Sequence, residues 1–281
     1  MISHVSGTRM LTTRCKHFLR KLVAAAAVLS FSFTDISCDS AFGAPSEIRL
    51  PNTILWAWQR AEDLTQLDPH EFGVAYLACN LVLSGDMVRT HWRDQPLKLA
   101  LETVIVPVIR IDIDRRHPPI LSDEQADKIA AVMNRIAATP RAALVQIDFD
   151  ALESERPFYR QLINRVRAAL PSGMPLSITS LASWCLFDNW IKDLPVDETV
   201  PMMFSLGHDR QKVMQYFASH ADFLVKSCCK SLGLSLEEPD VNQLMIPAAR
   251  QRKIPVRVYV FTRTAWNDKK IEAVRSMLGK P

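Results

Sequence analysis

The segment Ala143–Asp150 constrains the fold more than any other part of the chain, because its two faces differ in chemistry. One parity of positions is apolar, at Val145, Ile147 and Phe149, and the other is polar, at Gln146, Asp148 and Asp150. Successive side chains of a strand point to opposite faces, so one face suits burial under helices while the other carries carboxylates. A (β/α)8 barrel, the TIM barrel, uses such strands, with polar groups inside the barrel at the C-terminal ends.

Extended and helical segments alternate along the chain after residue 50, which is typical of a parallel sheet. The expected strands are Ile54–Trp58, Gly73–Cys79, Val104–Ile111, Ala143–Phe149, Leu176–Ser180, Thr199–Phe204, Leu232–Leu236 and Val256–Thr262. Eight strands in a chain of this length predict a single-domain (β/α)8 barrel. Ser84-Gly85-Asp86 predicts a tight hairpin turn, a small embellishment after the second strand.

Four segments between the strands carry the apolar stripe of a helix. The first begins at a capping box, Ser122 to Gln125, and continues to Ile136. The others are Phe158–Leu170, which Pro171 ends, Asp209–His220, and Asn267–Leu278 with Asn267 as N-cap. The chain has only eight glycines and no Gly-rich phosphate loop, so a Rossmann or P-loop fold has no support.

The N-terminus has the layout of a secretory signal peptide. Five basic residues in the first 21 precede an apolar run, Leu22–Phe33, and small residues follow at Ala41–Ala44. We expect residues 1–44 to be the signal peptide, cleaved after Gly43 or Ala44, and residues 45–281 to be the barrel, periplasmic or secreted. The alternative to a cleaved signal peptide is an uncleaved N-terminal membrane anchor. A lipoprotein attached through Cys38 is a further and weaker alternative, because Asp35 occupies a position where an aliphatic residue is expected.

Composition argues against nucleic acid and a membrane span as features of the chain after its N-terminal segment. The net charge of +4 comes from the basic start, so the remaining chain is roughly neutral and no nucleic-acid surface is expected. No later stretch is apolar enough to span a membrane, no cofactor or metal site is expected, and we expect a monomer. Cys79, Cys185, Cys228 and Cys229 allow a disulfide in an oxidising compartment, and the sequence leaves their pairing open.

The alternation seen in Ala143–Asp150 repeats in other strands and predicts a polar barrel interior. The residues expected inside are Arg110, Asp112, Gln146, Asp148, Asp150, Ser177, Thr179, Glu237, Arg257 and Tyr259. Trp56, Trp58, Trp184 and Trp266 lie within or just after strands. Buried charges need partners, so an Arg110–Asp148–Arg257 ion network that only fills the barrel is the structural explanation for these charges.

Carboxylates after the fourth and seventh strands, near tryptophans, are typical of retaining glycosidases. We expect Asp150 to be the proton donor and Glu238 or Glu237 the second carboxylate, with Asp148 and Arg110 tuning their protonation. The expected substrate-binding residues are Trp58, Trp184, Trp266, Tyr259, Arg110 and Arg257. The pattern Asp148-Phe-Asp150 is also similar to the strand-four motif of chitinase-type barrels, but Ala151-Leu152 follow where a final Glu is expected, and Glu153 or Glu155 would have to serve.

Two other functions stay open. A carbohydrate- or envelope-binding barrel would keep the fold and the aromatic residues without a productive pair of acids. Metal-dependent hydrolysis through Asp112, Asp148 and Asp150 is the weaker one, because no histidine lies at a strand end beside these acids.

Several runs of this sequence resemble the bacterial family named domain of unknown function 3142. They are Trp56–Leu64, Gly73–Ala78, Gln146–Ala151, Ser154–Tyr159, Leu176–Cys185 and Val258–Phe261. The resemblance covers nearly all of the chain after the signal peptide. It implies a secreted protein with a glycoside-hydrolase-like barrel, and it bears on the fold more than on the function.

Overall fold

The computed structural model describes residues 50–220, 222–252 and 256–279. The expected signal peptide, its cleavage zone and Cys38 lie outside the described residues. Eleven strands are present among them: β1 (Thr53–Ala57), β2 (Glu62–Leu64), β3 (Phe72–Ser84), β4 (Met87–Trp92), β5 (Leu97–Leu99), β6 (Ile105–Ile113), β7 (Val145–Asp148), β8 (Leu176–Leu181), β9 (Glu198–Met202), β10 (Ser231–Ser235) and β11 (Arg257–Phe261).

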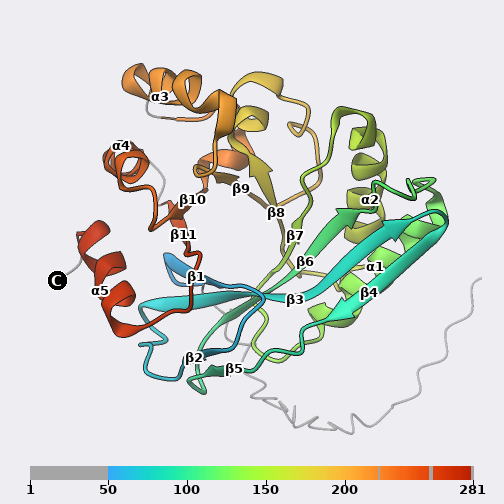
Figure 1. The fold of residues 1–281 in the computed structure, drawn as a ribbon, viewed down its shortest axis with the longest axis horizontal. Helices are drawn as coiled ribbons and strands as arrows, with labels where there is room; N and C mark the ends of the chain where they lie inside the picture. The colour runs from blue at the N-terminus through green and yellow to red at the C-terminus, as the bar shows by residue number, and fades with distance from the viewer. Residues whose placement is uncertain (1–49, 221, 253–255, 280–281) are drawn as a thin grey trace, which may run out of the picture. The chain divides into compact units, whose positions relative to one another are not determined.

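Eight of these strands form a closed parallel barrel (Figure 1). Their order is β1-β11-β10-β9-β8-β7-β6-β3, and β1 closes the ring by pairing with β3. Ile54 of β1 lies beside Tyr259 on one side and beside Gly73 on the other. All eight strands that the sequence predicted are therefore present, and the barrel is confirmed.

Two glycines allow close approach inside this ring. A Cβ atom on Gly73 would lie 2.6 Å from the Ile54 side chain, at the seam where β1 meets β3. A Cβ atom on Gly233 would lie 3.3 Å from the Trp56 ring and 3.2 Å from the carbonyl oxygen of Pro201. Glycine at position 233 thus leaves room for the Trp56 indole in the middle of the barrel.

Five α-helices follow strands in the described part of the chain: α1 (Asp123–Ala137), α2 (Arg156–Ala169), α3 (Arg210–Ser219), α4 (Pro239–Arg250) and α5 (Asp268–Met277). The capping box of Ser122 with Gln125 and the N-cap at Asn267 are both confirmed. Helix α4 was not predicted, although Pro239 at its first turn is a favoured start.

The remaining connections depart from a regular (β/α)8 pattern. Strand β2 lies between β1 and β3, and β4 and β5 lie between β3 and β6. A π-helical turn, Trp184–Asp188, follows β8. The predicted hairpin is confirmed, because β4 pairs antiparallel with the end of β3 across a turn in which Gly85 has a φ of 56°.

The alternation of β7 also separates two parts of the core. Val145, Ile147 and Phe149 belong to the large apolar cluster that includes the buried faces of the helices. A second, smaller apolar cluster fills the barrel, and it includes Trp56 and Tyr259. Gln146 and Asp148, of the opposite parity, are buried with the polar residues. The barrel interior is thus mixed. It holds an apolar cluster and, at the C-terminal end of β7, the carboxylate side chain of Asp148.

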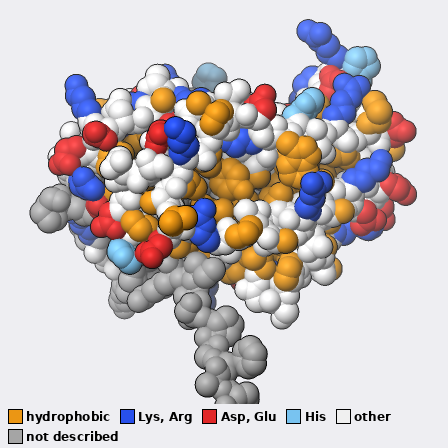
Figure 2. Space-filling model, turned by 90° about the horizontal axis from the view of Figure 1, so that it is seen from below, with side chains coloured by type: hydrophobic (Ala, Val, Ile, Leu, Met, Phe, Trp, Pro, Cys, Tyr) orange, Lys and Arg blue, Asp and Glu red, His pale blue; other side chains and the backbone are white. Residues whose placement is uncertain are grey.

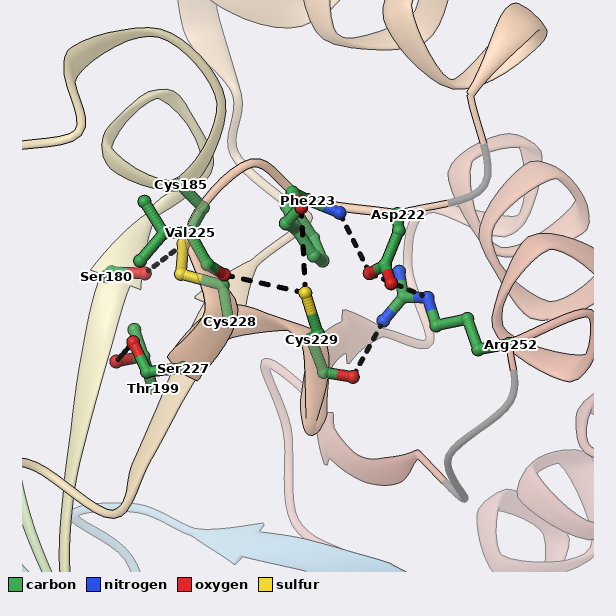
Figure 3. The surroundings of a disulfide bond; sticks show 10 residues. All are labelled: Ser180, Cys185, Thr199, Asp222, Phe223, Val225, Ser227, Cys228, Cys229 and Arg252. Carbon is green, nitrogen blue, oxygen red and sulfur yellow. Dashed lines mark hydrogen bonds and ion pairs between the residues drawn. A yellow bond between two sulfur atoms is a disulfide. The ribbon is translucent and has the colours of Figure 1, made fainter. Parts of the chain in front are cut away.

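A disulfide joins Cys185, in the π-helical turn after β8, to Cys228, just before β10. Figure 3 shows Cys229 beside it, with its thiol directed at the backbone carbonyls of Phe223 and Val225. Cys79 and Cys229 are free thiols. The structure therefore selects one pairing among those that the sequence left open.

Apolar side chains gather toward the middle of the face seen in Figure 2, and many charged ones surround them. No helix among the described residues is long and apolar enough to cross a membrane.

Candidate functional site

A cavity of about 290 Å³ opens at the C-terminal ends of the barrel strands, and we call it the mouth pocket. Its lining residues come from or just beyond the ends of β1, β6, β7, β8, β9 and β11. They are Trp56, Trp58, Val108, Arg110, Gln146, Asp148, Asp150, Thr179, Leu181, Met202, Phe204, Ser205 and Phe261. The fold class places its sites at this end, and the cavity is at the lower limit of small-molecule pockets.

One wall of the mouth pocket is charged and centres on Arg110. Its Nη1 donates to Asp148 Oδ2 over 2.8 Å, its Nε to Asp112 Oδ1 over 3.1 Å, and its Nη2 to Asp150 Oδ2 over 3.5 Å. Thr179 Oγ1 donates to the other oxygen of Asp148 over 2.7 Å. Asp148 thus accepts hydrogen bonds from two donors, and the predicted pairing of Asp148 with an arginine is confirmed.

The two acids that line the pocket have different surroundings. Desolvation raises the pKa of Asp150, the charge of Asp148 raises it further, and Arg110 opposes both. Burial on its own lowers the pKa of Arg110, but the surrounding carboxylates outweigh burial and raise it above its usual range. Arg110 is therefore a fixed cation, whereas Asp150 takes up a proton more readily than an ordinary aspartic acid.

A chain of hydrogen bonds forms the floor beneath these acids. Trp56 Nε1 donates to Gln146 Oε1 over 3.3 Å, and Gln146 Nε2 donates to Ser177 Oγ over 3.0 Å. All three side chains lie inside the barrel with at most 4% of their surface exposed. The floor is therefore fixed by packing as well as by hydrogen bonds.

Another part of the lining is apolar and aromatic. Phe204 and Phe261 stack face to face, with ring centroids 5.4 Å apart and an angle of 6° between the planes. Trp56 meets the edge of Phe204 at 6.2 Å. The sequence interpretation missed both phenylalanines, although their parity gives the signal: Phe261 continues the inward positions of β11, and Phe204 those of β9.

The expected second carboxylates do not line the mouth pocket. Glu238 accepts the backbone N–H of Ser205 over 2.7 Å and a hydrogen bond from Arg210 over 2.7 Å, so it lies behind the wall that Ser205 forms. Glu237 accepts from Thr262 Oγ1 over 2.7 Å and from Ser235 Oγ over 2.7 Å. Desolvation alone would raise its pKa, but its hydrogen bonds outweigh desolvation and lower it.

The expected Arg110–Asp148–Arg257 network is confirmed for the Arg110–Asp148 pair and wrong for Arg257, which lies at the other end of the barrel. Arg257 begins β11 and pairs with Glu198, which begins β9. Tyr259 is fully buried and donates to Glu198 Oε2 over 2.7 Å. The structure therefore places neither Arg257 nor Tyr259 at the pocket. The sequence interpretation missed Glu198, although its inward parity with Val200 signals it.

Two of the four tryptophans lie away from the mouth pocket. Trp184 packs outside the barrel against Trp190, with ring centroids 4.9 Å apart, in the cluster that the helices cover. Trp266 is buried, and its indole N–H donates to the carbonyl oxygen of Trp56 over 2.9 Å. Trp56 and Trp58 are the two that line the pocket.

The glutamates that a chitinase-type motif would need also lie elsewhere. Glu155 is buried, pairs with Arg115, and accepts the backbone N–H of Leu152 over 2.8 Å. Glu153 begins the 3-10 turn before α2. Neither lines the pocket, and Leu152 stands 54% exposed after Asp150. Among the described residues, no group of three or more His, Cys, Asp or Glu is arranged to hold a metal ion.

No family model and no curated protein matches this chain. Among solved structures, the fold is similar to that of the Bacillus cereus spore cortex-lytic enzyme SleL, at 16% sequence identity and a TM-score of 0.43. The match covers 67% of this chain and 51% of that one, so this chain spans about half the length of that protein.

Proposed function

We propose that this protein binds carbohydrate in the mouth pocket, outside the cytoplasm. The observation that carries the proposal is the pairing of two unlike walls in one small cavity. An aromatic wall offers flat apolar surface to a sugar ring, and the Arg110 wall offers charged donors and acceptors to its hydroxyl groups. The Cys185–Cys228 disulfide supports the location, because disulfides persist in oxidising compartments.

The test is binding to a panel of envelope polysaccharides and exopolysaccharides, measured by calorimetry on the purified protein. Trp58→Ala is expected to weaken binding at least ~10-fold, which corresponds to about 1.4 kcal/mol. Trp92→Ala is the matched control, because Trp92 lies on β4, is 43% exposed and does not line the pocket. The proposal fails if no carbohydrate binds, or if Trp58→Ala binds as tightly as Trp92→Ala.

Hydrolysis of a glycosidic bond is the second candidate, and the raised pKa of Asp150 favours it. A carboxylic acid that keeps its proton closer to neutral pH can donate it to the leaving oxygen. On an active substrate, Asp150→Asn would lower turnover at least ~100-fold while the protein stays folded. Full activity of that variant, with loss of activity in Asp148→Asn, would reverse the two roles.

The position of the other carboxylates favours binding over a two-carboxylate mechanism. That mechanism needs acids on the two sides of the scissile bond. Asp148 and Asp150 follow one another on the same wall, while Glu237 and Glu238 do not line the pocket. A hydrolase built on this pocket would therefore need a group of the substrate in place of the second carboxylate.

A further inference from the structure

We infer that the mouth pocket selects a sugar that carries a free, positively charged amino group, as a de-N-acetylated hexosamine does, over neutral sugars. This inference rests on the proposed carbohydrate binding and names the class of carbohydrate. Its basis is the charge of the pocket walls, which hold Asp148, Asp150 and Arg110. Two anions thus face the cavity with one cation.

The single arginine is shared among three carboxylates. Each of its nitrogens Nε, Nη1 and Nη2 is directed at a different acid, namely Asp112, Asp148 and Asp150. Asp112 also accepts from Asn80 Nδ2 over 2.9 Å, and Asp148 accepts from Thr179. Of the three contacts with Arg110, that of Asp150 is the longest, at 3.5 Å, and its side chain is 42% exposed. Asp150 is therefore the acid that the arginine compensates least.

The other walls of the pocket do not offset this excess of negative charge. The lining residues from β1, β8, β9 and β11 and the segments that follow them are uncharged, from Trp58 to Phe261. Behind the Ser205 wall, Glu238 and Arg210 pair with each other over 2.7 Å. Behind Trp58, Arg93 donates to the backbone carbonyl oxygens of Trp58 and Arg60, and it does not itself line the pocket. The charged lining residues are thus Arg110 on β6, Asp148 at the end of β7 and Asp150 two residues later. With both acids ionised, their net charge is negative.

The aromatic wall adds a second attraction for the same ligand. An ammonium group within about 6 Å of an indole or phenyl face gains roughly 0.5–2 kcal/mol from the ring quadrupole. Trp58, Phe204 and Phe261 line the same cavity as the acids, and Phe261 ends β11, which stands opposite β7 in the ring of eight strands. Desolvation, and after it the charge of Asp148, raises the pKa of Asp150, and a cation bound beside it would lower that pKa. An N-acetylated amine carries no charge and gains neither contribution.

The test compares three tetrasaccharides by isothermal titration calorimetry at about pH 6, where a free amine is protonated and most carboxyl groups are ionised. They are the tetramer of glucosamine, the same tetramer fully N-acetylated, and cellotetraose. We expect the free-amine tetramer to bind at least ~10-fold tighter than either neutral one. Asp150→Asn is expected to reduce this preference to within about 3-fold, with little change for the neutral tetramers.

Asp127→Asn is the matched control, since it makes the same chemical change on α1, where Asp127 is 60% exposed and pairs with Arg165. It is expected to keep the full preference, and thermal unfolding checks that both variants are folded. Equal affinity for charged and neutral tetramers would overturn the inference and leave carbohydrate binding standing. A preference that survives Asp150→Asn would also overturn it. Failure of all three tetramers and of the polysaccharide panel to bind would overturn both proposals.

Discussion

Arg110 Nη1 lies 2.8 Å from Asp148 Oδ2, and this ion pair joins β6 to β7 at the end of the barrel where the cavity opens. The Asp148 side chain is 5% exposed and the Arg110 side chain 30%. The carboxylate of this pair is therefore shielded from water, whereas the guanidinium is partly exposed to it. This ion pair fixes the position of the Arg110 guanidinium in the wall of the mouth pocket.

Removal of Arg110 should destabilise the protein by leaving Asp148 buried without its cation. We expect Arg110→Met to cost about 3 kcal/mol in the free energy of unfolding, at the lower end for buried pairs because Arg110 is partly exposed. Asp148→Asn combined with it should cost less than the sum of the single changes. Urea unfolding of the four proteins measures this coupling, and additive costs would contradict the assigned pair.

Asp150→Asn should stabilise the protein at neutral pH. The folded-state pKa of Asp150 is raised, so folding favours its protonated form and disfavours the carboxylate. The contribution of this group to stability is greatest below its unfolded pKa and is lost as pH rises through its folded pKa. The advantage of the asparagine variant should therefore be largest near neutral pH and vanish below about pH 3.8. A variant that is less stable at neutral pH would contradict this sign.

The pair at the opposite end of the barrel should affect stability and leave ligand binding unchanged. Glu198 accepts from Arg257, Ser231 and Tyr259, and all four lie away from the mouth pocket. Glu198→Gln removes the charge that compensates Arg257, and we expect it to lower stability by about 2–4 kcal/mol. Its affinity for carbohydrate should match that of the parent. A variant that keeps its stability and loses affinity for carbohydrate would contradict the separation of this pair from the mouth pocket.

The Cys185–Cys228 disulfide should make a large contribution to stability, because it closes a loop over a sequence separation of 43. The double change to serine is expected to cost about 3–4 kcal/mol, or roughly 10 °C in Tm. Cys229→Ser is the control. Burial raises the pKa of the Cys229 thiol to about 11, so this thiol is expected to react slowly with alkylating reagents in the folded protein. Mass mapping that joins Cys229 to Cys185 would contradict the assigned pairing.

The sequence predicts this fold well because burial imposes a period of two on the strands and of 3.6 on the helices. Val145 to Phe149 show the first pattern, and it alone predicts the inward position of Asp148. Parity does not fix height along the barrel axis. Arg110 and Arg257 both point inward, yet one lies near the end of its strand and the other at the start of its strand, so they have different partners.

The position of groups after a strand end was harder to predict. Glu237 and Glu238 follow β10, where the backbone turns into α4, so parity no longer applies. Their partners, Thr262 and Arg210, come from other loops that the sequence does not place. Trp184 likewise follows β8 and turns outward in the π-helical turn. Residues within strands were therefore placed correctly more often than residues beyond them.

The most direct test of the account is a crystal structure of the protein with the glucosamine tetramer bound. We expect a sugar ring in the mouth pocket, against Trp58 and the Phe204–Phe261 stack, with its amino group within about 3 Å of Asp150. A tetramer bound at another surface while the mouth pocket holds no sugar would contradict it.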